Sequence, residues 1–322
     1  MQKYIKAIES ENISKVDKNE LKQVLSEKDE HGDTLLHFAS RVHNLPAIRL
    51  LVDLGADPEA MNEHGRRPIH EAIDSVECLS YLIKTCGVDT NAMKRGDWTP
   101  IMIAGKLLVE SGALLKRTTR DGRTPLYLAV QEGHLEASKF LTDQYPDAIT
   151  QATNSGRLAI QAAAALPSTD TAFEITNYLL SHATVPLSTL LSYRDNSGRN
   201  IVLDAVVAQN LPLLEYLLFK ANANVDDADS LGRRMVHHAA MMGHLKVLKA
   251  LNQWNTISDW NIVDNWDHWT PLMHAARQGH QQVVDYLINT IHADPTIKDK
   301  QQRTAKDIAS LWQHTAIAEL LS

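Results

Sequence analysis

Apolar residues recur along the chain in short helical stretches separated by polar turns. Stretches such as IRLLVDLGAD (48–57), ASKFLTDQ (137–144) and VVDYLINT (283–290) place apolar residues three and four positions apart. This spacing gives a helix one apolar face. A shorter stretch beginning at Thr-Pro or its equivalent, such as GRTPLYLA (122–129), comes before each of them. The pattern therefore predicts pairs of short amphipathic helices, repeated many times.

The residues at the ends of these stretches explain where the helices begin and turn. Threonine caps a helix start, and proline in the first turn loses no backbone donor. Gly-His pairs at 133–134, 243–244 and 279–280 mark the turn between two helices, because glycine tolerates the left-handed conformation. A single helix hairpin cannot bury its apolar face alone. We therefore expect an all-α, elongated solenoid of stacked helix hairpins with projecting β-hairpin-like loops.

The repeat has a period near 33 residues. The residues two before Thr-Pro or its equivalent, here called the loop-glycine positions, are spaced by 33, 32, 25, 34, 42, 34, 36 and 34 residues. This period and the signature T-P-L-H-x-A identify the chain as a member of the ankyrin repeat family. The signature appears in GDTLLHFA, GRRPIHEA, DWTPIMIA, GRTPLYLA, HWTPLMHA and QRTAKDIA. The loop-glycine positions are Gly32, Gly65, Asp97, Gly122, Gly156, Gly198, Gly232, His268 and Gln302.

The spacings also predict how the chain is divided. Residues 1–29 should form an N-terminal capping half-repeat, and residues 30–322 about nine repeats, the last of them a C-terminal cap. The third repeat is shortened, so we expect a weak point at 97–122 with fast hydrogen exchange near 105–112. The fifth repeat is lengthened by LPSTDT (166–171) in its interhelix turn and TVPLSTLLSYRD (184–195) in its exit loop.

Composition narrows the setting of the protein. Only two cysteines occur in 322 residues and the first residues lack a long apolar run, which indicates a reducing compartment, the cytosol or the nucleus. No stretch approaches the roughly 20 apolar residues of a membrane span. A net charge of −7 argues against a general nucleic-acid binder. We expect a monomer that contacts neither membrane nor nucleic acid directly.

Motifs for catalysis or metal binding are absent from the sequence. It contains no GxSxG, HExxH, P-loop or CxxC, so we expect neither an enzyme nor a bound cofactor or metal. Cys78 should be a core residue and Cys86 should lie near the surface. Six histidines fall where the repeat requires them, and we interpret them as structural. They are His37, His70 and His237 in the signature and His134, His244 and His280 in the turn.

The concave surface formed by the loops and first helices is the expected binding surface for a protein partner. Arginine follows the loop-glycine position in six repeats. These arginines would either form a ladder that binds an acidic partner or serve as ordinary residues of the loop. We favour the second interpretation. The six are Arg66, Arg123, Arg157, Arg199, Arg233 and Arg303.

A basic cluster on two consecutive loops is a more specific candidate. It would steer an acidic partner, because charge accelerates encounter more than it adds affinity; a solvated cluster without a partner is the alternative. Later loops are acidic, with VDDADS (225–230), Asp259, Asp264 and Asp267. The cluster consists of Lys94, Arg95, Lys116, Arg117, Arg120 and Arg123, with Trp98 and Tyr127 around it.

Tryptophan marks a second candidate, since four of the six fall within residues 254–269. Trp260 replaces a loop-base residue and should be packed. Trp266 should occupy a loop tip, and Trp269 the exposed position that other repeats give to arginine. Tryptophan is enriched in binding hot spots. We predict an interface at Trp266 and Trp269; burial between neighbouring loops is the alternative.

Several motifs together suggest a narrower relationship. GDTLLH (32–37), RRPIHEA (66–72), MKRGDWTPIM (93–102), RDNSG (194–198) and DSLG (229–232) resemble, in this order, the family of ankyrin repeat domain-containing protein 16. The resemblance implies a cofactor of alanyl-tRNA synthetase that limits serine mistranslation, with lysine side chains taking part. Lys94 matches the family's first lysine before DW, whereas Arg95 departs from its second. The alternative is an adaptor or effector that recruits an unrelated client protein.

Overall fold

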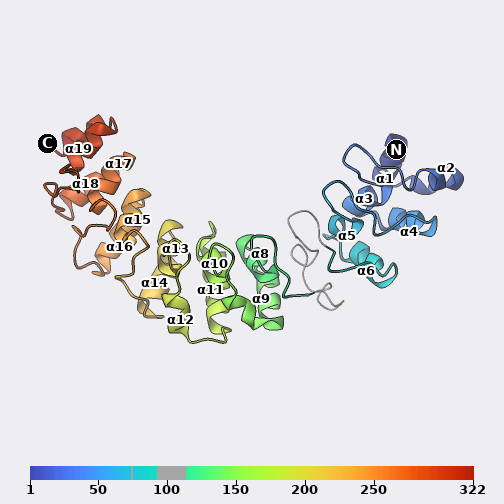
Figure 1. The fold of residues 1–322 in the computed structure, drawn as a ribbon, viewed down its shortest axis with the longest axis horizontal. Coiled ribbons are helices and arrows are strands. Elements are labelled where there is room, and N and C mark those ends of the chain that lie inside the picture. The colour runs from blue at the N-terminus through green and yellow to red at the C-terminus, as the bar shows by residue number, and fades with distance from the viewer. Residues whose placement is uncertain (74, 93–113) are drawn as a thin grey trace. The chain divides into compact units, whose positions relative to one another are not determined.

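The computed structural model describes residues 1–73, 75–92 and 114–322 (Figure 1). These residues form helices and loops, with no strand among them, which confirms the all-α prediction. Residues 97–113, which hold most of the predicted short repeat and its weak point, lie outside the described residues. Contacts divide the chain into two compact units, Met1–Ala129 with Glu136–Ala148 and Val130–Leu135 with Ile149–Ser322.

In the first unit, helices pack as consecutive pairs. Helix α3 contacts its own partner α4, the preceding α1 and the following α5, while α4 contacts α6. The described helices up to the second unit are α1 (Gln2–Glu9), η1 (Ile13–Lys15), α2 (Lys18–Gln23), α3 (Leu35–Arg41), α4 (Leu45–Asp53), α5 (Pro68–Glu71), α6 (Val76–Lys84), α8 (Pro125–Gln131), α9 (Leu135–Gln144) and η3 (Pro146–Thr150).

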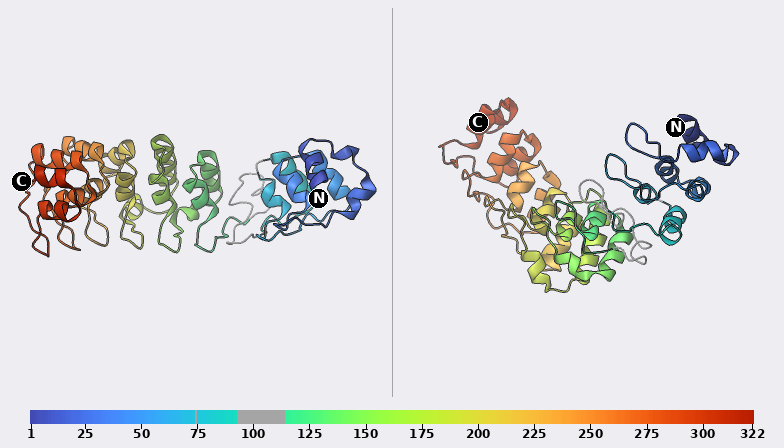
Figure 2. Two further views of the ribbon diagram at one scale, coloured as in Figure 1. Left: turned by 90° about the horizontal axis from the view of Figure 1, so that it is seen from above. Right: turned by 45° about the vertical axis from the view of Figure 1, so that its right-hand side comes forward.

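In the second unit, the first helices of successive pairs pack on one another and the second helices form a layer beside them, and the loops project to one side (Figures 1 and 2). The first helices are α10 (Ala159–Ala164), α13 (Ile201–Val207), α15 (Met235–Met241), α17 (Pro271–Gln278) and α19 (Ala305–Leu311). The second helices are α11 (Thr169–Ser181), α14 (Leu211–Phe219), α16 (Leu245–Gln253), α18 (Gln281–Asn289) and α20 (Thr315–Leu320), and α12 (Leu187–Ser192) is additional.

The first helices begin as their sequences predict. The Thr270 hydroxyl accepts a hydrogen bond from the Met273 amide (3.2 Å) at the start of α17. Thr124 does the same for Tyr127 (3.0 Å) at the start of α8. A proline follows each threonine, where the helix has no use for an amide donor. Threonine and proline therefore set these helix starts.

The projecting loops share one backbone conformation. Every loop-glycine position within the described residues has a positive φ, between 57° at His268 and 79° at Gly32. Asp229 shows how the loop closes, because its Oδ1 accepts hydrogen bonds from the amides of Leu231 and Arg233 (both 2.9 Å). Neighbouring loops are also joined to each other, as when the Ser230 amide donates to the Ser197 carbonyl (3.0 Å) and the Asn265 amide to the Leu231 carbonyl (2.8 Å).

The lengthened repeat differs from its prediction. The segment 184–195 was expected to be a loop, but it contains α12, whose Leu190 and Leu191 are buried. The insertion at 166–171 also leads directly into α11, which runs for 13 residues. Leucines at adjacent buried positions supply the apolar contact that a short helix needs. The extra residues are therefore partly helical.

The cysteines agree with their predictions in part. Cys78 is buried in α6, where burial raises the pKa of its thiol. Cys86, expected near the surface, is half-buried, and burial raises the pKa of its thiol too. Both thiols are therefore less ionised than a free cysteine and are poor nucleophiles.

Candidate functional site

Each of the six arginines in register pairs with a carboxylate of the repeat array. Arg233 and Arg303 each bind the aspartate four residues earlier, with N–O distances of 2.7 Å to Asp229 and Asp299. Those two aspartates are buried. The others also pair: Arg66 with Glu71, Arg123 with Asp121, Arg157 with Asp204, and Arg199 with Asp195 and Asp204. These pairs favour the structural reading of the ladder.

The predicted basic cluster is only partly described. Lys94, Arg95 and Trp98 lie outside the described residues. Lys116, Arg117 and Arg120 are exposed, and Arg123 is half-buried. The Lys116 ammonium lies 5.4 Å from the centre of the Tyr145 ring, at a pocket of about 580 Å³ that Leu114, Leu115, Arg117 and Gln144 also line.

Tyr127 does not belong to the accessible part of this cluster. Its side chain is only 7% exposed, because Tyr127 lies in the first turn of α8, which packs into the core. Its ring is therefore covered by the protein itself, and its contact with a partner stays a prediction. Tyr127 supports the helix that follows the basic loop.

The two tryptophans predicted to form an interface have opposite environments. Trp266 is 65% exposed, as predicted for a loop tip. Trp269 is only 8% exposed, so the prediction that it is exposed is wrong. The loop from Asp264 to Trp269 is one residue longer than that from Asp229 to Arg233. In this longer loop the Trp269 indole N–H donates to Asp299 of the next repeat (3.1 Å).

Trp266 and Trp269 contribute to a pocket of about 360 Å³ that we call the tryptophan pocket. It lies between the loops and the ends of α15, α17 and α19 in the second unit. Pockets of about 300–1,000 Å³ are large enough to hold small ligands or side chains. The lining residues are Leu231, Arg233, Met241, Asp264, Trp266, Asp267, Trp269, His274, Arg277, Gln301, Arg303, Leu311 and Trp312.

Exposed apolar side chains are concentrated at this pocket. Trp266, Leu311 and Trp312 are 65%, 62% and 50% exposed, and Trp266 and Trp312 are the two exposed tryptophans among the described residues. Such residues are costly to leave in water and are enriched where proteins bind. The pocket therefore has the composition of a binding hot spot.

Arg277 lies between two indole rings. Its guanidinium carbon is 5.4 Å from the centre of the Trp269 ring and 5.0 Å from that of Trp312. Stacking on aromatic faces leaves the N–H edge of a guanidinium open for a bidentate contact with a carboxylate. Within the described residues, Arg277 makes no ion pair, in contrast to Arg233 and Arg303.

Buried aspartates stabilise the base of the pocket. Burial works to raise the pKa of Asp299, but hydrogen bonds from Arg303 and Trp269 outweigh it and lower that pKa. The pKa of Asp264 is lowered in the same way, by the hydrogen bond from His274 at 2.9 Å. These carboxylates stay ionised at neutral pH and hold the surrounding donors in place.

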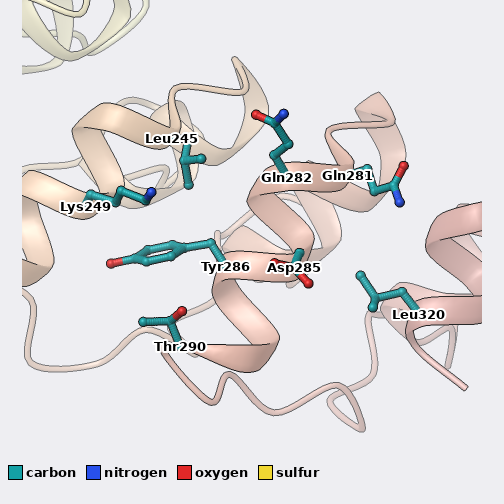
Figure 3. Close-up of a pocket in the computed structure, with 8 residues that line it drawn as sticks. All are labelled: Leu245, Lys249, Gln281, Gln282, Asp285, Tyr286, Thr290 and Leu320. Atoms are coloured by element: carbon teal, nitrogen blue, oxygen red, sulfur yellow. The ribbon is translucent and has the colours of Figure 1, made fainter.

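A second depression, of about 780 Å³, lies on the second helices α16, α18 and α20 (Figure 3). The Lys249 ammonium lies 5.8 Å from the centre of the Tyr286 ring there. Gln281, Gln282 and Asp285, also drawn in the figure, are exposed polar side chains. This surface provides a comparison for the tryptophan pocket, because it also pairs a cation with an aromatic ring but exposes no tryptophan.

Sequence reasoning missed Arg277, Leu311 and Trp312. A signal was present in the repeat alignment, because Leu311 and Trp312 occupy the positions of Arg277 and Gln278 one repeat earlier. An apolar pair at an exposed position exceeds what the repeat requires. The position of Arg277 between two rings depends on contacts between repeats, which the alignment does not give.

The described residues contain neither a metal-binding cluster nor a membrane-spanning helix. No group of three or more histidines, cysteines, aspartates or glutamates is arranged there to hold a metal ion. Within the same residues, no helix has both the length and the apolar character needed to span a bilayer.

Stacked pairs of short helices with loops projecting to one side define a helical repeat protein, a class that presents an extended surface to other molecules. Family models of ankyrin repeats in three copies match residues 7–94, 76–152, 102–189 and 236–322. A model of ankyrin repeats in many copies matches residues 202–251. The chain belongs to the ankyrin repeat family.

Curated relatives match parts of the chain. The neurogenic locus Notch protein of Drosophila melanogaster is 32% identical over 84 residues, which are 26% of this chain and 3% of that protein. Human neurogenic locus notch homolog protein 2 is 29% identical over 126 residues, 36% of this chain and 5% of that protein. Human transient receptor potential cation channel subfamily A member 1 is 25% identical over 141 residues, 41% of this chain and 13% of that protein. The match therefore covers only a small part of each relative.

Proposed function

We propose that this chain is a non-enzymatic protein-binding scaffold that holds its partner at the tryptophan pocket, on the concave face formed by loops and first helices. The observation that carries the proposal is the exposure of Trp266 and Trp312 at a pocket that Arg277 also lines. Family membership supports it, because ankyrin arrays act mainly through protein contacts. In this proposal residues 1–29 cap the array of 30–322, and the protein is a monomer of the cytoplasm or nucleus.

Removing the exposed indoles tests the proposal. The double variant Trp266→Ala, Trp312→Ala should weaken partner binding by about thirtyfold or more, since truncating a hot-spot side chain costs about 2 kcal/mol or more. Phe219→Ala is the matched control, because Phe219 is also an exposed aromatic residue (48%) but lies at the end of second helix α14. Affinity is measured by surface plasmon resonance on a partner captured from lysate with the wild-type chain. Equal affinities of wild type and double variant would reject the pocket as the site.

As the partner we propose alanyl-tRNA synthetase, on the basis of the motif resemblance. The purified synthetase of the same organism should bind the chain without tRNA, because a chain of net charge −7 lacks the general basic surface that tRNA demands. No binding at micromolar concentration would leave the scaffold function standing with a different client.

Lys94→Arg separates binding from chemistry at the lysine that matches the family motif. The change keeps the positive charge but removes a primary amine that could react with an activated amino acid. We expect the synthetase to remain bound while protection against serine misincorporation is lost. Retained protection would show that Lys94 has no chemical role.

A further inference from the structure

We propose that the tryptophan pocket recognises an acidic peptide segment with one large apolar side chain, phenylalanine or leucine, next to a carboxylate. The inference deepens the proposed function and rests on it, because it names the chemistry of the partner segment at that site. The apolar side chain contacts Trp266, Leu311 and Trp312, and the carboxylate binds Arg277.

The apolar half of the proposal follows from exposure and size. Trp266 approaches from the loop tip and Leu311 and Trp312 from the end of α19, and all three are at least half exposed. Burying them with an inserted side chain removes apolar surface of both molecules from water. A volume of about 360 Å³ fits one large side chain with its neighbouring backbone, rather than a folded surface.

The preference for an acidic segment follows from which charged side chains of the pocket remain accessible. Three arginines line the pocket, against the two acids Asp264 and Asp267. Asp264 is buried and bound to His274, so it presents little negative charge to solvent. Asp267 is half-buried and is the acid of the lining that remains partly accessible. Arg233 and Arg303 are largely satisfied by the aspartates behind them, whereas Arg277 has no carboxylate partner within the described residues.

Arg277 is also held ready for a planar anion. Its guanidinium group contacts the rings of Trp269 and Trp312, and Trp269 is itself held by the hydrogen bond to Asp299. A side chain already ordered loses less entropy on binding. A basic peptide would instead place its charge against Arg277, although the electron-rich indole faces alone would attract it. Charge at the pocket therefore selects the acidic segment.

Three short synthetic peptides test the inference with the full-length chain. They carry a central phenylalanine between glutamates, the same phenylalanine between lysines, and a central alanine between glutamates. Binding is followed by NMR on the indole N–H signals of Trp266 and Trp312, assigned from single Trp→Phe variants. The acidic phenylalanine peptide should bind at least tenfold tighter than either of the others, and salt should reduce that advantage over the lysine peptide.

Two variants test whether Arg277 causes the preference for the glutamate peptide over the lysine peptide. Arg277→Gln should reduce the preference for glutamate over lysine to less than threefold while the preference for phenylalanine over alanine persists. Lys249→Gln is the matched control, because it removes a cation over an aromatic ring on the second helices and should change neither preference. Persistence of the preference for phenylalanine over alanine in Arg277→Gln would confirm that the apolar part of its pocket is intact.

Equal binding of all three peptides, no binding of any, or tighter binding of the lysine peptide would overturn the inference. Retention of the charge preference in Arg277→Gln would overturn the role of Arg277. The proposed function has its own test, whose result is independent of the peptide experiment. If Trp266→Ala, Trp312→Ala still weakens binding of the captured protein, the scaffold proposal stands and only the acidic segment is wrong.

Discussion

At the scale of single residues, the signature histidines connect each repeat to the next. The His37 Nδ1 accepts a hydrogen bond from the Thr34 amide (3.2 Å), and its Nε2 donates to the Arg66 carbonyl (3.0 Å). His237 does the same with Arg234 and Ile262 (both 3.0 Å). This pattern requires the neutral ring with its proton on Nε2. The sequence prediction that these histidines are structural is confirmed.

Gln161 occupies the position of the signature histidine in its own repeat and shows which hydrogen bonds that position requires. Its Oε1 accepts from the Leu158 amide (3.1 Å) and its Nε2 donates to the Arg199 carbonyl (2.9 Å). An amide side chain therefore makes both hydrogen bonds of the histidine. It does so without a group that titrates near neutral pH.

His237→Gln should make the protein more resistant to acid. Burial and the neighbouring His274 lower the pKa of His237 to about 3, although Asp264 acts in the opposite direction. An unfolded histidine has a pKa of about 6.5, so the unfolded state takes up a proton as the pH falls below that value. The free energy of unfolding therefore decreases as the pH is lowered from about 6.5 to about 3. At pH 5 the decrease has reached about 2 kcal/mol. The variant should lose about 2 kcal/mol less than wild type between pH 7 and pH 5.

Urea denaturation at both pH values measures this difference. Burial raises the pKa of Asp204 to about 6, but it contributes equally to wild type and variant and cancels. His292→Asn is the control, because His292 is exposed and asparagine tolerates its positive φ of 58°. An unchanged acid sensitivity in His237→Gln would show that His237 is protonated in the folded protein.

At the scale of elements, the turn between two helices links each pair to the previous one. His244, His280 and His314 each donate from Nε2 to a carbonyl of the preceding repeat, at 2.9–3.0 Å. Asn44 and Asn210 reach back from the same position, to Ile8 (2.8 Å) and Thr169 (3.2 Å). Whether it is a histidine or an asparagine, the residue after the left-handed turn therefore donates a hydrogen bond to the preceding repeat.

The interhelix turns and helix starts were predictable because their requirements are local. Glycine predicted the left-handed turns at Gly133, Gly243 and Gly279, whose φ angles are 73°, 73° and 78°. The positive φ of His268 and Gln302 was not predicted. The helix in the 184–195 insertion was not predictable, because it depends on where Leu190 and Leu191 are buried. The candidate site was predictable at Trp266 and not at Trp269, whose burial depends on Asp299 in another repeat.

Gly198→Ala should destabilise the second unit more than Gly133→Ala. Both glycines have nearly the same φ, 77° and 73°, so the cost of the left-handed conformation, about 1 kcal/mol, is shared. A Cβ on Gly198 would clash with the Ser230 amide nitrogen, whereas one on Gly133 meets only side chains at 3.7 Å or more. Pushing two loops apart should add about 2 kcal/mol.

Thermal unfolding of the two variants gives the comparison. Hydrogen exchange at the Ser230 amide reports the local effect, because this amide is bonded to Ser197 in the wild type. Equal melting temperatures would mean that the loops adjust without cost.

At the scale of the whole molecule, charge is unevenly distributed. The chain carries a net charge of −7, yet Lys116, Arg117 and Arg120 lie exposed within one short segment of the first unit. Exposed charges add little to affinity, but they raise the rate at which an oppositely charged partner is encountered. We propose that this segment steers a partner while the tryptophan pocket holds one, so the two surfaces should affect different rate constants.

Reversing Lys116, Arg117 and Arg120 to glutamate should slow association about tenfold at low salt and leave dissociation nearly unchanged. At physiological ionic strength the Debye length is about 8 Å, so most of the difference should disappear. The control variant reverses Lys15, Lys18 and Lys22 to glutamate. These lysines are also exposed in the first unit, and the net charge changes by the same amount. Stopped-flow or surface plasmon resonance with the captured partner separates the two rate constants. A slower association in both triple variants would mean that only net charge matters, and an unchanged association rate in both would reduce the basic segment to an ordinary solvated surface.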